Sequence, residues 1–309
     1  MNKSPRSKSP VSKSPRSKSP KSKSPVSKSP RSKSPKMSNL PNEMLELITE
    51  NIPQMSDRTA FAKSSKQINV ALMGPGAIKG KGSELKITRI DQVDKAVENH
   101  VSKIRVSTDD TKLAEYFASR MKDMKYVTHL TLNYWIPPIN NKISTLPPNL
   151  VKFEASYINN LPTLPQTLQY LDVSESQPLK ITKLPPKLVH LSLVDCGLET
   201  LPQLPSTLVY LNIGTNSINE LPKLPSTLVY LNVVDNGLES LPKLPLSLVE
   251  LRASSNQLTE LPTLPSKLKI LHVANNELSE LPKLPHTIRQ ICVGGNEELT
   301  LDDCINFQV

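Results

Sequence analysis

The sequence predicts an α/β solenoid, in which parallel strands line one concave face and extended segments return between them. The first observation is a period, because from residue 161 to residue 281 a unit led by leucine, or by isoleucine at 181, begins every 20 residues. The second is its regularity, since the letters LPSTLVYLN occupy both 204–212 and 224–232. A fixed period of about 20–50 residues is typical of solenoids, whose units bury their apolar faces against one another.

Each unit reads LPxLPxxLxxLxVxxNxL, and its short strand carries two inward-facing apolar residues, such as Leu211 and Ile213. Three residues after the second comes an asparagine, whose side-chain amide is expected to bond backbone groups of adjacent turns inside the apolar stack. Cys196 stands in the same column, so we predict that it is a structural rather than a reactive thiol. The asparagines of this column are Asn216, Asn236, Asn256, Asn276 and Asn296.

The two Leu-Pro pairs in each unit explain how it closes within 20 residues. Proline fixes φ, donates no backbone hydrogen bond and favours extended backbone in the residue before it. The return path is therefore predicted to be extended, polyproline-like chain instead of a helix.

This unit resembles a leucine-rich repeat, and its short form with two Leu-Pro pairs is similar to the repeats of bacterial secreted effectors. Some of those effectors carry a ubiquitin-ligase domain that is built around a nucleophilic cysteine. Only five residues follow Cys304 in this sequence, so we expect no such domain. The five histidines are scattered without metal-ligand spacing, and the sequence predicts no enzyme, no metal site and no cofactor.

The repeat pattern continues upstream with other spacings. We expect strand–helix units over residues 84–145, with strands near Leu85, Ile104 and Leu130, because amphipathic helical segments lie between these positions. The short-repeat solenoid is predicted over residues 146–301, and residues 302–309 are expected to form a C-terminal tail.

Residues 1–36 are a basic, low-complexity segment in which SKSP recurs every five residues. This segment holds twelve basic and no acidic side chains, whereas residues 37–309 hold 26 basic and 28 acidic ones, a net charge of −2. Frequent proline and the lack of an apolar face predict that the segment is disordered.

Each Ser-Pro pair of this tail is a minimal site for a proline-directed kinase. Phosphates at all seven pairs would offset the positive charge, since each adds about −1.5 to −2. The unmodified tail is alternatively a site for nucleic acid or another polyanion, and a third interpretation is a solubilising repeat without a partner. The candidate phosphorylation sites are Ser4, Ser9, Ser14, Ser19, Ser24, Ser29 and Ser34.

Residues 38–73 are predicted to form a small helical module. Leu40-Pro41, Glu43, Pro53 and Asp57 follow one another in the order and spacing of an F-box, which this segment resembles. The alternative is a helical cap on the repeats, and the glycine-rich stretch 74–83 is expected to be a linker. The F-box resemblance implies docking on a Skp1-like adaptor subunit of a cullin-type ubiquitin ligase through Leu40, Pro41, Leu45, Ile48 and Ile52.

F-boxes joined to leucine-rich repeats are similar to substrate receptors of such ligases, and giant DNA viruses of amoebae encode proteins of this kind. We therefore expect a non-catalytic protein-interaction adaptor that holds an unknown protein client. The alternative is a repeat-containing binding protein without a ubiquitin role, which is localised by its phosphorylatable, polyanion-binding tail.

The concave face is the predicted client-binding surface, because strand residues that flank a buried leucine point away from the core. Tyrosine and arginine are favoured in interfaces, and several share neighbouring rungs here. The alternative is that near-identical repeats simply duplicate the same residues. The predicted binding residues are Tyr170, Tyr210, Asn212, Tyr230, Asn232 and Arg252.

The three cysteines show no paired spacing, which favours a reducing compartment over a disulfide scaffold. The sequence has no apolar run of about 18 residues and no secretory signal at its start. We expect a monomer in the cytoplasm or nucleus, of a host cell if the source is viral.

Overall fold

The computed structural model describes residues 84–133, 143–158, 160–299 and 304–307. The predicted tail (1–36), the F-box-like module (38–73) and the linker (74–83) lie outside the described residues, and so do the candidate phosphorylation and Skp1-binding positions. Among the residues that are described, no helix has both the length and the apolar character that crossing a membrane requires.

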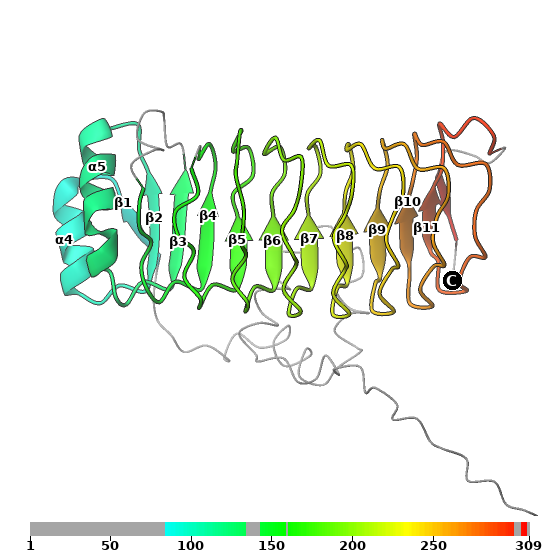
Figure 1. The fold of residues 1–309 in the computed structure, drawn as a ribbon. Helices are drawn as coiled ribbons and strands as arrows, with labels where there is room; N and C mark the ends of the chain where they lie inside the picture. The colour runs from blue at the N-terminus through cyan, green and yellow to red at the C-terminus, as the bar shows by residue number, and fades with distance from the viewer. Residues whose placement is uncertain (1–83, 134–142, 159, 300–303, 308–309) are drawn as a thin grey trace, which may run out of the picture. The chain divides into compact units, whose positions relative to one another are not determined.

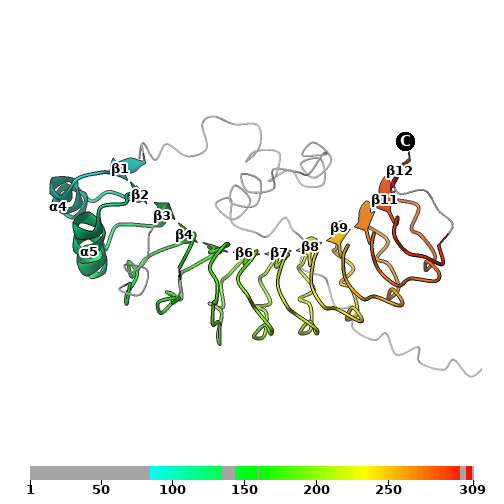
Figure 2. The same ribbon diagram turned by 90° about the horizontal axis from the view of Figure 1, so that it is seen from above.

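The first part of the array alternates strands with helices, as the sequence predicts. Asp110 caps the second helix, because its carboxylate accepts a hydrogen bond from the backbone N–H of Lys112 at 2.8 Å. The helices bury Val93, Ala96, Leu113, Ala114 and Phe117, and they lie on the side of the sheet away from its concave face (Figure 2). The elements are β1 (Leu85–Ile87), α4 (Ile90–Glu98), β2 (Lys103–Ser107), α5 (Thr111–Arg120), the 3₁₀ helix η2 (Met121–Asp123) and β3 (His129–Asn133).

From residue 152 onward each turn contributes one short strand, and within residues 173–289 the return segments contain no helix. This agrees with the extended returns that the Leu-Pro pairs predict. The strands are β4 (Lys152–Ala155), β5 (Tyr170–Asp172), β6 (His190–Ser192), β7 (Tyr210–Asn212), β8 (Tyr230–Asn232), β9 (Glu250–Arg252), β10 (Ile270–His272), β11 (Gln290–Cys292) and β12 (Cys304–Asn306).

In the described part of the chain these strands form a 12-stranded sheet in sequence order (Figure 1). Neighbours from β1 to β11 pair in parallel, and only β12 is antiparallel to its neighbour. Figure 2 shows the strands along the concave side of the array. The predicted leucine-rich-repeat solenoid, with parallel strands on its concave face, is confirmed.

The second proline of each unit begins the turn that leads into the strand. The backbone N–H of Leu208 donates to the carbonyl of Pro205 at 3.1 Å, and Leu228 bonds Pro225 in the same way. The hydroxyl of Thr207 also donates to the carbonyl of Leu188 in the preceding turn, at 2.6 Å. These turns are thus closed internally, and those with a hydroxyl at this position are also tied by it to the preceding turn at the entrance to the strand.

The asparagine column satisfies backbone groups, as predicted. The Asn236 amide nitrogen donates to the carbonyls of Ile213, Val233 and Val234 at 3.0–3.2 Å, and its oxygen accepts from the N–H of Ile218 at 3.1 Å. Cys196 is fully buried in the same column, and burial raises the pKa of its thiol to about 12. Its predicted structural role is confirmed.

The C-terminal end corrects two expectations. Residues 304–306 form strand β12 within the segment that we expected to be a tail, and Cys304 is joined to Cys292 by a disulfide. The expectation of unpaired cysteines is wrong for these two, because the antiparallel pairing of β12 with β11 places Cys304 directly opposite Cys292. The sequence gives no hint of this, since β12 lies outside the 20-residue repeat.

Candidate functional site

Two columns of side chains run across the strands on the concave face, one on each side of the buried leucines. Parallel pairing without a shift in register stacks residues 20 apart in the sequence from β5 to β11. Column one is Tyr170, His190, Tyr210, Tyr230, Glu250, Ile270 and Gln290. Column two is Asp172, Ser192, Asn212, Asn232, Arg252, His272 and Cys292.

Column one begins with a stack of aromatic rings. The ring of His190 lies 4.0 Å from that of Tyr170 and 4.0 Å from that of Tyr210, and Tyr210 lies 4.3 Å from Tyr230, all nearly parallel. The four side chains are at most 8% exposed. The Lys152 ammonium caps the stack, 4.4 Å from the centre of the Tyr170 ring. The ring faces are therefore in contact with one another, and the stack offers little accessible area to a partner.

Burial controls the protonation of this stack. It raises the pKa of the Tyr170 and Tyr210 phenols above the usual range, with neighbouring acidic groups adding to the effect. It lowers the pKa of His190 to about 3, assisted by the positive charge of Lys152. The imidazole is therefore neutral at physiological pH, and its Nδ1 is buried without a hydrogen-bond partner.

Column two is polar and more accessible at its centre. Asn212, Asn232 and Arg252 are half-buried and lie on the adjacent strands β7, β8 and β9. The Asn232 oxygen accepts from the backbone N–H of Val234 at 3.0 Å, which fixes the side chain in place. The structure therefore brings the predicted binding residues of both columns together, but the accessible part of that surface lies in column two.

A charged cluster follows the aromatic stack at β9 and β10. Glu250 is fully buried, and the Arg252 guanidinium donates to its Oε1 at 2.5 Å and contacts His272 Nδ1 at 3.2 Å. Burial raises the pKa of the Glu250 carboxyl, while the bond from Arg252 opposes that shift. Since a guanidinium can only donate, His272 Nδ1 accepts and a neutral ring carries its hydrogen on Nε2. The Oε2 of Glu250 and the Nε2 of His272 are buried without partners.

The first strands carry a second charged region. Arg105 on β2 bonds Glu84 at 2.9 Å, and on β4 Lys152 bonds Glu154 at 3.0 Å. Glu154 also accepts from the hydroxyl of Thr131 at 2.8 Å. The concave face thus has charged pairs toward both ends and aromatic and amide side chains between them.

Sequence reasoning missed the two charged regions and the ring stack. A usable signal was present, because opposite charges two residues apart on one strand, as in Glu250 and Arg252, flank the same buried leucine. His190 and His272 lie in different columns on β6 and β10, so they do not form one site, as predicted. Among the described residues no group of three or more His, Cys, Asp or Glu side chains is arranged to hold a metal ion.

Several solved structures of bacterial effectors are similar to this chain. YopM from Yersinia enterocolitica WA-314 is 30% identical over 63% of this chain and 46% of its own, with a TM-score of 0.45. A Shigella effector LRR domain is 42% identical over 33% of this chain and 46% of its own, with a TM-score of 0.33. YopM from Yersinia pestis, a leucine-rich effector protein, is 27% identical over 55% of this chain and 54% of its own, with a TM-score of 0.42.

The chain spans about half the length of each of these proteins. Because every TM-score is below 0.5, the fold rests on the strand register and repeat geometry of this chain itself. No family model matches the sequence, and no curated protein matches it.

Proposed function

We propose that this chain is a non-catalytic adaptor whose concave sheet binds a protein client. The observation that carries the proposal is the unbroken parallel sheet with half-buried polar side chains at the centre of column two. Solenoids characteristically use such extended concave surfaces for binding. Asn212, Asn232 and Arg252 offer amide and guanidinium donors to a partner's backbone or acidic side chains.

The more specific proposal is a substrate receptor of a cullin-type ubiquitin ligase. It rests on the F-box resemblance of residues 38–73, in which Leu40, Pro41, Leu45, Ile48 and Ile52 would contact a Skp1-like adaptor. An apolar helical face of this kind is suited to binding in a groove of a partner. The repeats would then present the client for modification.

Two experiments separate the parts of this proposal. Co-expression with a Skp1-like protein should recover a stable complex with the full chain, and Leu40→Asp or Ile48→Asp should abolish it. Deletion of residues 1–36 serves as the control, because it removes the tail and leaves the module intact. Failure to recover the Skp1-like protein with the unaltered chain would reject the ligase role without affecting client binding.

Client binding is tested with a photo-crosslinking amino acid in column two. Placed at Asn232, the probe should capture a defined protein, and Arg252→Glu should reduce that capture at least tenfold. A probe at Lys223, an exposed residue of the return segment, is the matched control. Equal capture from both positions would contradict a binding role for the concave face.

The second candidate function is favoured by the twelve basic and no acidic residues of the tail. In this case, residues 1–36 bind nucleic acid or another polyanion and set the location of a repeat protein without a ubiquitin role. Binding of single-stranded RNA should then weaken steeply with salt and should disappear on deletion of residues 1–36. Phosphorylation of the Ser-Pro pairs should weaken it as well, because it offsets the positive charge.

A further inference from the structure

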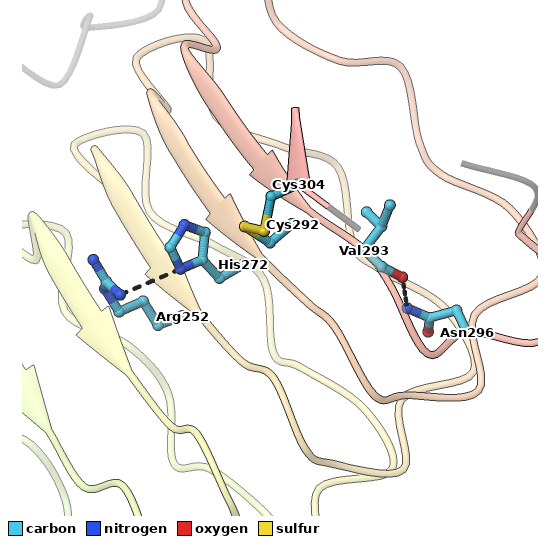
Figure 3. Close-up of a disulfide and its surroundings, with 6 residues drawn as sticks. All are labelled: Arg252, His272, Cys292, Val293, Asn296 and Cys304. Atoms are coloured by element: carbon cyan, nitrogen blue, oxygen red, sulfur yellow. Dashed lines mark hydrogen bonds between the residues drawn. A yellow bond between two sulfur atoms is a disulfide. The ribbon is translucent and has the colours of Figure 1, made fainter. Parts of the chain in front are cut away.

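The last strand of the sheet is attached to the array by a disulfide. Strand β12 pairs antiparallel with β11, and the register aligns Ile305 with Ile291 and Cys304 with Cys292. The bond between the two sulfurs joins the strands at one end of that pairing (Figure 3).

The side chains of β12 and of the residue after it are largely exposed. Cys304 and Asn306 are exposed, Ile305 is half-buried, and Phe307 is 44% exposed. The backbone N–H of Phe307 donates to the carbonyl of Arg289 at 2.8 Å. A strand of three residues at a sheet edge gains little from such contacts once the cost of ordering it is counted. The disulfide closes a loop over a sequence separation of 12 residues. Because it lowers the entropy cost of closing that loop, it favours the docked over the undocked strand by about a hundredfold.

The two cysteines differ in exposure and in surroundings. Cys304 is exposed, whereas Cys292 is only 8% exposed. Cys292 continues column two beyond His272 and Arg252, and Figure 3 shows the imidazole between the guanidinium and the disulfide. A thiol that approaches from solvent therefore reaches Cys304, and Cys292 is the leaving group.

The neighbours of Cys292 favour its departure as a thiolate. Arg252 lies two strands from Cys292, where it pairs with Glu250, and a positive charge in the surroundings of a thiol stabilises the thiolate. A leaving group that is stabilised in this way departs faster in thiol–disulfide exchange.

We propose that Cys292–Cys304 is a reversible thiol–disulfide exchange site, with a small thiol or dithiol as its reductant, whose opening releases β12 from the sheet. The reductant thiolate attacks Sγ of Cys304, the bond between the two cysteines breaks, and its electron pair leaves with Cys292. A second thiol then attacks the mixed disulfide on the reductant's sulfur and releases Cys304. Two electrons and two protons pass to the protein, and the reductant becomes a disulfide.

Release of β12 changes the interaction surface at this end of the array. With β12 removed, the N–H and C=O groups on the outer edge of β11 lose their partners. An unpaired edge is a template for another strand. The redox state of the pair therefore determines whether β11 or the short strand β12 forms the outer edge of the described sheet.

Cys196 provides an internal control. Its Sγ lies within hydrogen-bond distance of the carbonyls of Val173 and Val194, at 3.4 and 3.5 Å, in a fully buried site. It should remain unlabelled by a thiol reagent in the native protein at any redox state, whereas Cys292 and Cys304 should be labelled together.

The experiment uses the full chain equilibrated in buffers with different ratios of reduced to oxidised dithiothreitol. Maleimide labelling with mass spectrometry measures the free thiols, and amide hydrogen exchange measures protection of β11 and β12. We expect two labelled thiols on reduction, at least tenfold faster exchange in residues 304–307, unchanged protection of β7 and β8, and full reversal on oxidation. Cys304→Ser should show the fast exchange without reductant, and Cys196→Ser should behave like the unaltered chain.

Either of two results would overturn the proposal. Cys292 and Cys304 could remain unpaired under fully oxidising conditions, or residues 304–307 could stay protected after complete reduction. The role of the Arg252 charge is tested with Glu250→Gln combined with Arg252→Gln, so that no buried charge is left without its partner. We expect reduction to slow about threefold to tenfold, and an unchanged rate would remove Arg252 from the mechanism.

Discussion

The burial of His190 in the ring stack predicts that the fold loses stability in mild acid. The size of that loss follows from the pKa of its imidazole. Burial lowers its pKa to about 3, against about 6.5 in an unfolded chain. Between these values the unfolded chain binds a proton that the folded chain does not, so stability falls as the pH falls below about 6.5. From pH 7 to pH 5, this group alone should lower the free energy of unfolding by about 2 kcal/mol.

The substitution His190→Tyr isolates this contribution, because tyrosine continues the stack of Tyr170 and Tyr210 without titrating in this range. Urea unfolding followed by circular dichroism at pH 7 and pH 5 gives the loss of stability for each protein. His129, whose pKa burial lowers to about 4, and the carboxylates are the same in both proteins and cancel in the comparison. We expect the variant to lose about 2 kcal/mol less than the unaltered chain.

The control is His286→Tyr, which alters an exposed histidine and should leave the acid-induced loss unchanged. Equal losses for His190→Tyr and the unaltered chain would refute the argument. That result would mean that His190 takes up its proton without leaving the folded stack.

Three further predictions concern stability at neutral pH, measured by urea unfolding. Asn236→Ala removes the partners of one N–H and several carbonyls and should cost about 3 kcal/mol, whereas Asn219→Ala, at an exposed position of the preceding turn, should cost less than about 0.5 kcal/mol. Thr215→Asn should stabilise the fold by about 1 kcal/mol, because Thr215 has a φ of 56° and asparagine adopts this left-handed region more readily. Lys267→Thr should add about 0.5–1 kcal/mol by restoring the hydroxyl-to-carbonyl bond that Thr207 makes in its own turn. A loss of stability in either of the last two variants would contradict the repeat geometry described above.

The framework of this fold could be predicted because the sequence repeats. A 20-residue period fixes which residues align on adjacent strands, so the buried position of Leu211 and the bonding of Asn236 follow from spacing alone. Cys196 was assigned correctly for the same reason. Strand β12 falls outside the repeat, and nothing near Cys304 in the sequence indicates an antiparallel partner.

The environment of the tyrosines was harder to predict because it depends on the distance between turns. Adjacent strands lie about 4.8 Å apart, which is close to the stacking distance of aromatic rings. Rings in the same column therefore meet face to face, as Tyr210 and Tyr230 do at 4.3 Å. The tyrosine surface that we predicted to contact a partner is largely buried against neighbouring rings of the same chain.

The backbone conformation of the residue before Cys196 and before the next four asparagines of that column could not be anticipated either. Asp195, Thr215, Asp235, Ser255 and Asn275 all have φ between 55° and 58°. Threonine and serine do not favour this region, so their presence there follows from closure of the turn rather than from their own propensity. The geometry of the turn overrides the preference of the residue.

The two columns of the concave face also bear on whether the predicted site reflects function or duplication. Simple copying of units would preserve concave and buried positions alike. The buried leucines persist on β7, β8 and β9, yet column one changes from Tyr230 to Glu250 and column two from Asn232 to Arg252. The column-two positions are half-buried and less constrained by packing than the buried leucines, so the change from Asn232 to Arg252 indicates that this part of the concave surface has diverged between units. This supports recognition by column two, for which the crosslinking position at Asn232 and the change at Arg252 are direct tests.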